Sequence, residues 1–392
     1  MKRLLLLTAA VAMLCTACGE PTATPAGAQP ASTTVLTATS TTTATSTTTT
    51  TITTPTSTLP PVETDVYDDV MFELPLRGAT GYASVSMPLY GDVDRTDLTA
   101  TLTAGTAFTV LGQTDADTWH IRTADGTAGY VENTTCYLNI ADVVPSVVLD
   151  NTNSYSSAFY SSGKELPDIT GRQLYDAKEY NPRLGREEFL VACNWQTVQK
   201  IYTAQQLALA QGYTLVINEA FRPMDVQLNI ASVLKTLYDT DTEVKAGIDT
   251  APWNISWFIA NRPSTHQMGC AIDTSLARVT ATETRRCGDY TYRVVTAYNL
   301  CAMPTPIHEL SAAAVSLSKP VNSSSATAWQ PIAPAASMTE DALKLREFCT
   351  QAGFSPLASE WWHFNDLTTK NTVGERYTTD PFYLDTCLSV VP

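Results

Sequence analysis

The chain lacks the surplus of basic residues that nucleic-acid-binding proteins need. Its 392 residues include 24 Lys and Arg against 39 Asp and Glu, which gives a formal net charge of −15 at pH 7. Nucleic acids are bound largely by neutralising phosphates with basic side chains, so this balance argues against a nucleic-acid partner. Long apolar runs are also missing after the first residues, and no later stretch has the length and apolarity of a membrane-spanning helix.

Cysteine pairs with the spacing of a zinc finger are missing as well. Of the nine cysteines, no two that follow residue 18 are separated by just two residues. Seven cysteines remain beyond that point, and an odd number outside the cell leaves at least one thiol unpaired. Cys287 and Cys301 are close enough in sequence to close a modest loop, which makes them a candidate disulfide.

Residues 1–18 have the pattern of a secretion signal. Lys2 and Arg3 precede an apolar stretch at 4–14 that is too short to span a bilayer. The Cys-Thr-Ala-Cys sequence that ends at Cys18 is similar to a bacterial lipoprotein signal, in which the matching cysteine is lipidated after cleavage. An ordinary cleaved signal peptide is the alternative. The leader predicts an extracellular protein, anchored at the bacterial surface by a lipid on Cys18.

A low-complexity segment at 19–64, dominated by Thr with Ser, Ala and Pro, follows the leader. Such a composition cannot bury enough apolar surface to offset its chain entropy. We expect an extended stalk that holds the rest of the protein away from the membrane.

A small β-rich unit is expected at 78–141. Short β-prone runs at 83–89, 107–112, 119–122 and 127–131 are separated by turn residues, and Asp125-Gly126 is a strong hairpin signal. The succession of Gly105-Thr106, Val110-Leu111-Gly112, Trp119 and Gly129-Tyr130-Val131 resembles a bacterial Src-homology-3-like barrel. That family commonly binds cell-wall material; the simpler alternative is a barrel with Trp119 in its core.

Residues 147–392 form the predicted large domain. Apolar spacing predicts helices at 197–212, 226–237 and 340–352, with strands at 213–218 and 270–274. A stretch at 316–337, rich in Ser, Ala and Pro, is expected to be a surface loop. Helices and strands mix without regular alternation, so we predict an α+β fold.

Two of the four histidines lie in contexts suited to a metal site. His266 precedes Gly269 and, seven residues on, Asp273; imidazole and carboxylate suit a catalytic zinc, which takes three protein ligands. His363 ends the sequence Glu360-Trp-Trp-His, where a loop can place the imidazole on the metal and Glu360 on the water that zinc acidifies. For each histidine, the commoner alternative is a structural residue with its hydrogen bonds satisfied. The two Trp residues are either an apolar wall that excludes water from the site or ordinary core.

An arginine follows the expected strand at 213–218. In the sequence Glu219-Ala-Phe-Arg222-Pro, the arginine is costly to bury unless it is paired. It is a candidate for stabilising the oxyanion of a tetrahedral intermediate. The alternative is a structural pair between Arg222 and Glu219.

These motifs together resemble the zinc D-alanyl-D-alanine peptidases, whose pattern is Ser-x-His-x-x-Gly-x-Ala-x-Asp followed by Glu-x-Trp-His or Glu-Trp-Trp-His. The Trp-Trp form and Phe221-Arg222-Pro223 are similar to the D-Ala-D-Ala dipeptidase branch known from vancomycin resistance, as is the segment 303–306. The resemblance implies a mixed or antiparallel sheet with flanking helices. It also implies His266, Asp273 and His363 as zinc ligands, Glu360 as general acid/base and Arg222 as the residue that stabilises the intermediate.

His308 stands where that branch usually has an acidic residue. It lies near the segment expected to shape the substrate pocket, so it either alters specificity or is a surface residue.

The predicted function is zinc-dependent hydrolysis of D-alanyl-D-alanine-type bonds in cell-wall peptides, as dipeptidase or carboxypeptidase. The expected partners are peptidoglycan stem peptides or free D-Ala-D-Ala, the wall through the small barrel, and the membrane through Cys18. A peptidoglycan endopeptidase and a lipoprotein that binds wall peptides without cutting them are the alternatives.

Overall fold

A computed structural model of the protein describes residues 72–150, 159–169, 178–380, 382–384 and 386–392. The chain divides into two units, Met1–Val62 and Glu63–Pro392, and every described residue belongs to the second. The predicted leader (1–18) and stalk (19–64) lie outside the described residues and stay predictions. Among the residues that are described, no helix combines the length and apolarity needed to cross a membrane.

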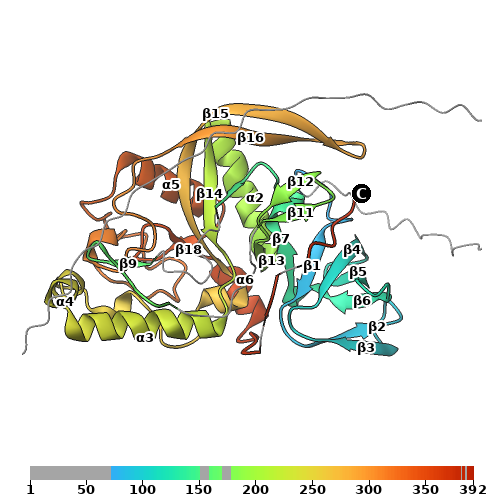
Figure 1. The fold of residues 1–392 in the computed structure, drawn as a ribbon, viewed down its shortest axis with the longest axis horizontal. Helices are drawn as coiled ribbons and strands as arrows, with labels where there is room; N and C mark the ends of the chain where they lie inside the picture. The colour runs from blue at the N-terminus through green and yellow to red at the C-terminus, as the bar shows by residue number, and fades with distance from the viewer. Residues whose placement is uncertain (1–71, 151–158, 170–177, 381, 385) are drawn as a thin grey trace, which may run out of the picture. The chain divides into compact units, whose positions relative to one another are not determined.

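An eight-stranded antiparallel sheet begins the described chain (Figure 1). Its order is β13-β7-β1-β4-β5-β6-β2-β3, and all its pairs are antiparallel. The strands are β1 (Thr80–Ala83), β2 (Met87–Tyr90), β3 (Leu98–Leu102), β4 (Ala107–Gln113), β5 (Thr118–Thr123), β6 (Ala128–Glu132), β7 (Cys136–Asn139) and β13 (Ala192–Asn194). The β-prone runs at 107–112, 119–122 and 127–131 correspond to β4, β5 and β6. The resemblance to a Src-homology-3-like barrel that binds the wall stays a prediction.

A six-stranded sheet forms the centre of the large domain. Its order is β17-β18-β15-β14-β8, with β16 paired to β15, and β14 and β8 are its parallel pair. The strands are β8 (Val148–Leu149), β14 (Tyr213–Glu219), β15 (Ala271–Cys287), β16 (Tyr290–Leu300), β17 (Ser355–Pro356) and β18 (His363–Asn365). A mixed, mainly antiparallel sheet combined with helices confirms the α+β prediction.

Six α-helices lie among the described residues. They are α1 (Ile140–Val143), α2 (Trp195–Ala210), α3 (Met224–Thr240), α4 (Thr242–Ile248), α5 (Glu340–Gln351) and α6 (Leu367–Val373). Helix α2 begins where the Asn194 side chain accepts a hydrogen bond from Gln196 N (3.0 Å), and it buries Val198, Ile201 and Ala208 at helical spacing. The expected helices at 197–212, 226–237 and 340–352 are confirmed by α2, α3 and α5.

Short elements complete the described chain. They are η1 (Asn133–Thr135), η2 (Ile255–Trp257), η3 (Thr265–Met268), η4 (Ala312–Ala314), and the two-stranded pairs β9 (Tyr160–Ser161) with β10 (Lys164–Glu165) and β11 (Glu179–Asn181) with β12 (Arg186–Glu188). Residues 316–337 contain neither helix nor strand, as expected for a loop.

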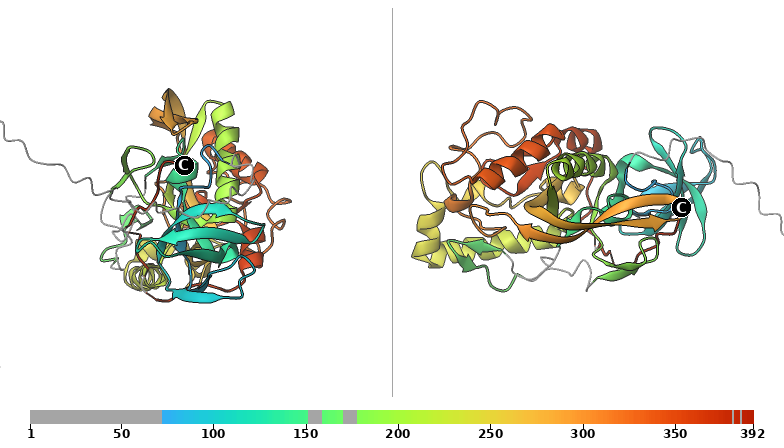
Figure 2. Two further views of the ribbon diagram at one scale, coloured as in Figure 1. Left: turned by 90° about the vertical axis from the view of Figure 1, so that its right-hand side faces the viewer. Right: turned by 90° about the horizontal axis from the view of Figure 1, so that it is seen from above.

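The hairpin β15–β16 corrects two predictions. The short strand expected at 270–274 is the start of a 17-residue strand, because the β-prone residues that follow pair with β16 along most of their length. The hairpin is the long pair of strands at the top of Figure 1, and Figure 2 shows it from above. Cys287 lies at its tip, opposite Tyr290, whereas Cys301 follows the far end of β16, so the candidate disulfide between them is wrong and both thiols are free.

The core is continuous between the two sheets. Trp119 of β5 is fully buried, as its core interpretation predicts, and its ring lies 5.6 Å from that of Trp195 at the start of α2. Both residues belong to one hydrophobic cluster that includes members of both sheets. The N-terminal sheet and the large domain therefore share packed side chains.

A glycine ends the short helix that precedes β15. Gly269 has a left-handed backbone (φ 63°), and a Cβ added there would lie 2.6 Å from Tyr137 Cε1 and 2.7 Å from Asn194 N. Only glycine satisfies both the conformation and the close approach of β7 and β13.

We expect Gly269→Ala to destabilise the protein by about 1–3 kcal/mol more than Gly185→Ala, because overpacking adds to the left-handed strain. Gly185 is the matched control, since its φ is 64° and a Cβ added there would meet no atom within 4 Å. Urea unfolding of both variants measures the difference; equal losses would show that the approach of β7 is not tight.

Candidate active site

The register of three adjacent strands places three site residues in one row. In β14, β15 and β18, Glu219 pairs with Asp273, and Asp273 pairs with His363. Directly paired residues of antiparallel strands project from the same face of a sheet. A register shift in β14 between Ile217 and Glu219 brings Glu219 opposite Asp273. Residues far apart in the sequence thus meet at one point.

His266 reaches this row from η3. The Ser264 side chain and Gln267 form a capping box that fixes the start of the helix. The Nδ1–H of His266 donates to the Ala220 carbonyl (2.6 Å). Because a carbonyl can only accept, the neutral ring carries its lone pair on Nε2, which lies 3.1 Å from His363 Nδ1 and 3.3 Å from Asp273 Oδ1.

His363 is oriented in the same way from the other side. Its Nε2–H donates to Asn365 Oδ1 (3.0 Å), and Asn365 Oδ1 also accepts from the Thr265 hydroxyl. The lone pair of the neutral ring is therefore on Nδ1, 3.0 Å from Asp273 Oδ1. Second hydrogen bonds of this kind typically fix the tautomer of metal-binding histidines.

With both rings in these neutral tautomers, two nitrogen lone pairs and a carboxylate oxygen converge with no hydrogen-bond donor between them. His266, Asp273 and His363 are each at least 94% buried, and they form a group of side chains able to hold a metal ion. Such a convergence is repulsive unless a cation or extra protons lie within it. Two imidazoles with one carboxylate are a ligand set of catalytic zinc sites. The three residues predicted as ligands are thus brought together and fit the metal.

The second oxygen of Asp273 faces a different set of groups. Oδ2 accepts from Arg222 Nη2 (2.9 Å) and lies 3.1 Å from His308 Nε2. Burial acts to raise the pKa of Asp273, but its contacts with the neighbouring histidines outweigh burial and hold it well below its usual value. The carboxylate is therefore fixed by both oxygens, with Oδ1 directed at the histidine pair.

Arg222 forms the structural pair that the sequence left open, and it also lines the site. Its Nε and Nη2 donate to the two oxygens of Glu219 (2.9 and 2.5 Å), and Nη1 donates to Gln227 Oε1 (2.8 Å). With the bond to Asp273, four of its five N–H donors are used, which leaves one on Nη1. Glu219, Asp273 and His308 also lie close enough to hold an ion, but the guanidinium supplies positive charge there.

His308 is a buried contact of Asp273 and is only 1% exposed, so its interpretation as a surface residue is wrong. Its ring stacks on Phe159 (4.6 Å) and meets Trp362 edge to face (5.9 Å). Its backbone is left-handed (φ 62°). It acts on the site through the carboxylate of Asp273.

Glu360 lies beside the histidine pair, with Oε2 3.6 Å from His363 Nδ1. Burial raises the pKa of this carboxyl to about 7, with a further contribution from the charge of Asp273, while His363 and Arg222 oppose the rise. A carboxyl with a pKa near 7 can both accept and return a proton at neutral pH. The position and pKa suit an acid/base role.

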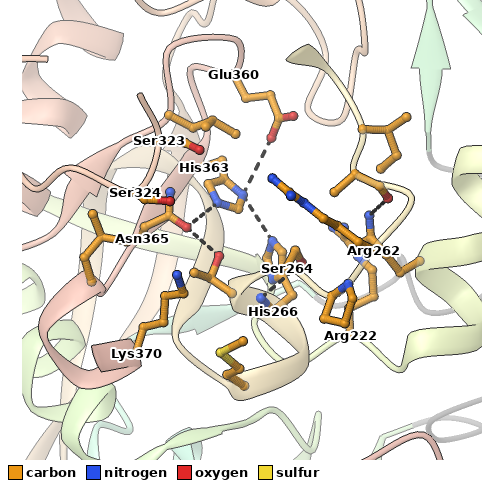
Figure 3. Close-up of a pocket in the computed structure, with 18 of the residues that line it drawn as sticks. Arg222, Arg262, Ser264, His266, Ser323, Ser324, Glu360, His363, Asn365 and Lys370 are labelled. Atoms are coloured by element: carbon orange, nitrogen blue, oxygen red, sulfur yellow. Dashed lines mark hydrogen bonds and ion pairs between the residues drawn. The ribbon is translucent and has the colours of Figure 1, made fainter. Parts of the chain in front are cut away.

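These groups share one pocket. Arg222, His266, Glu360 and His363 line a cavity of about 540 Å³, and Figure 3 shows their side chains directed at a common space. Trp361 and Trp362 are not among its lining residues and are almost fully buried, so they are core and not a pocket wall.

Sequence reasoning missed several contributors to the pocket. Asn365 follows His363 by two residues in a strand, and period-two spacing on one face was a usable signal. The cations Arg262 and Lys370, and the serines of the loop at 316–337, had no such signal. Arg262 and the serines reach the pocket from loops, and Lys370 reaches it from α6, so their place depends on tertiary packing.

We expect the carboxyl of Glu360 to make the stability of chelator-treated protein depend on pH. Its folded-state pKa of about 7 exceeds the usual 4.5, so the folded state holds a proton that the unfolded chain releases between these values. Stability should fall by up to about 3 kcal/mol as pH rises through this window, at about 1.4 kcal/mol per pH unit.

Glu360→Gln should remove this loss, and the exposed control Glu187→Gln should keep it, in urea unfolding at pH 4.5 and 8. An unchanged slope in Glu360→Gln would contradict the raised pKa.

Comparison with known proteins agrees with this geometry. No curated protein matches the chain. Residues 167–381, more than half of the chain, match the profile of the family described as D-ala-D-ala dipeptidase. The matched segment includes the proposed metal ligands His266, Asp273 and His363. It also includes Glu360 and Arg222. The chain therefore belongs to the D-ala-D-ala dipeptidase family, which indicates a metallopeptidase, and its strands bring together residues that could hold a metal ion.

Proposed function

We propose that the protein hydrolyses D-alanyl-D-alanine-type bonds of cell-wall peptides with zinc held by His266, Asp273 and His363. The observation that carries this proposal is the convergence of Nε2, Nδ1 and Oδ1 of these residues, all within 3.3 Å of one another. Glu360 and Arg222 line the same pocket. Family membership supports peptidase activity on wall peptides, and the residues favour zinc over harder ions.

When bound, zinc polarises the scissile carbonyl and makes water at the site more acidic. Glu360 accepts the proton of the water that attacks the carbonyl carbon. The same carboxyl then delivers this proton to the nitrogen of the leaving amine as the C–N bond breaks. Its pKa of about 7 suits both transfers.

Arg222 is positioned to stabilise the negative charge that develops on the carbonyl oxygen. Its guanidinium lines the pocket, and its bidentate pair with Glu219 holds it in place before substrate arrives. The structural pair and the catalytic role are therefore compatible.

The pocket also favours a substrate with a free carboxylate. Arg262 and Lys370 both line it, and neither forms an ion pair within 4.0 Å with another described residue. In a protein of net charge −15, the cations Arg262 and Lys370 at this pocket support an anionic ligand, although Glu375 also lines it. A terminal D-alanine carboxylate fits, so we favour a dipeptidase or carboxypeptidase over an endopeptidase.

The setting of this activity rests on sequence motifs. We propose a bacterial surface lipoprotein, anchored through Cys18 and held at the wall by its stalk. The N-terminal sheet is proposed to contact wall material, as Src-homology-3-like barrels do.

Glu360→Gln should lower kcat about 10²- to 10⁴-fold on a D-Ala-D-Ala-ended stem peptide, because the variant cannot carry the proton. Its zinc content should stay at one ion per chain, whereas His266→Ala should lose zinc. Metal analysis and product detection by mass spectrometry provide the measurements. A wild-type protein that binds wall peptides and zinc but releases no product would instead be the non-catalytic binding protein.

Amidating the C-terminal carboxylate of the peptide should raise KM for the wild type by roughly tenfold or more, since charge-assisted hydrogen bonds to a carboxylate contribute about 1.5–3 kcal/mol. Arg262→Ala should show a smaller penalty for amidation, and the exposed control Lys319→Ala the full penalty. Equal rates on internal and terminal bonds would favour the endopeptidase.

A further inference from the structure

We propose that the N-terminal sheet positions the metal-ligand segment through Tyr137, so that metal affinity depends on a residue outside the family-matched segment. Tyr137 belongs to β7, whereas the match begins at residue 167. The inference rests on the proposed function only in taking His266 as a metal ligand.

Tyr137 contacts η3 directly. Its hydroxyl donates to the carbonyl of Gln267 (3.0 Å), the residue that follows His266, and both partners are buried. Its ring occupies the space in which a side chain at 269 would lie, since a Cβ added to Gly269 would come within 2.6 Å of it. One aromatic side chain thus limits the movement of η3 at two points shortly after the ligand.

The same ring also supports the other side of His266. Tyr137 packs against Phe221 at 5.1 Å, and Phe221 lies between Ala220 and Arg222. Ala220 supplies the carbonyl that fixes the His266 tautomer, and the Gln267 side chain donates to the Arg222 carbonyl (2.9 Å). Segment 220–222 and η3 are therefore joined to each other and to Tyr137.

Strand β13 holds the end of η3 beside Tyr137. It pairs with β7 at the edge of the N-terminal sheet, and Asn194 N donates to the Gly269 carbonyl (2.9 Å). Figure 1 shows β7 and β13 at the part of this sheet nearest to β18. The position of η3 is consequently set by backbone and side-chain contacts from two strands of that sheet.

The C-terminal segment completes the packing around Tyr137. Phe382 lies 4.6 Å from Phe221 and 5.7 Å from Tyr137, and Leu384 belongs to the same buried cluster. The Tyr82 hydroxyl holds this segment by donating to the Thr386 carbonyl (2.9 Å). Tyr82 belongs to the same buried cluster, but its hydroxyl donates to the C-terminal segment and not to η3. It is therefore a suitable control for Tyr137.

A metal site needs its ligands held within about 0.5 Å of the productive geometry. His266 lies on a single short turn, which has little rigidity of its own. The contacts of Tyr137 with Gln267 and Gly269 therefore hold η3, and with it His266, in position. This role makes Tyr137 a positioning residue that acts through His266.

The test compares Tyr137→Phe with Tyr82→Phe. Both variants keep the ring of a buried tyrosine and remove one hydroxyl that donates to a backbone carbonyl. Zinc affinity of the full chain is measured by competition with a chromophoric chelator, and thermal unfolding is measured after metal removal. We expect Tyr137→Phe to weaken zinc binding roughly tenfold, the lower end of outer-shell effects, and Tyr82→Phe to leave it within about twofold. Both should lower Tm of the metal-free protein similarly.

Equal zinc affinity in Tyr137→Phe and Tyr82→Phe would overturn the proposal, whether both keep the wild-type affinity or both lose it. Neither outcome affects the proposed function, which instead fails if the wild type binds no zinc or shows no turnover. Should Tyr137→Phe fold poorly, Phe221→Leu offers a second measurement: it removes the ring on which Tyr137 packs, leaves the capping box of η3 intact and should also weaken zinc binding.

Discussion

The site depends on a single cross-strand register. Asp273 lies between Glu219 and His363 on neighbouring strands, and its two carboxylate oxygens contact two different groups of side chains. Oδ1 faces the histidine pair, and Oδ2 faces Arg222 and His308. A shift of β15 by one residue would turn Asp273 to the other face of the sheet and dismantle both sets of contacts, because side chains alternate along a strand. Every role assigned to the surrounding residues follows from the position of this carboxylate.

Buried charge is the second constraint. Glu219 and Asp273 share Arg222, and Asp273 and Glu360 share His363, yet each of the three carboxyls is more than 90% buried. Arg222 offsets part of this negative charge. Burial alone would lower the pKa of its guanidinium, but the charge and hydrogen bonds of Glu219 outweigh burial and raise it. Burial raises the pKa of Glu360 to about 7, so this carboxyl titrates near neutral pH. A divalent ion held by His266, Asp273 and His363 would add positive charge beside these carboxyls.

Packing extends this dependence beyond the catalytic domain. Tyr137, Phe221 and Phe382 come from three separate parts of the chain and meet behind η3. Because interiors are close-packed, a change in one of these side chains shifts its neighbours. The N-terminal sheet therefore contributes to the architecture of the site itself, whether or not it also contacts the wall.

The sequence alone determined the residue types that could carry the chemistry. The contexts of His266, Asp273 and His363 indicated a metal site, the position of Glu360 before His363 indicated an acid/base, and apolar periodicity predicted α2, α3 and α5. These are local signals, set by residues within one turn or strand of each other. The contact of His308 with Asp273, the length of β15 and the contribution of Tyr137 could not be read in this way. The contacts of His308 and Tyr137 depend on packing between segments more than 30 residues apart, and the length of β15 depends on its register with the adjoining β16. Only the tertiary structure decides which segments meet.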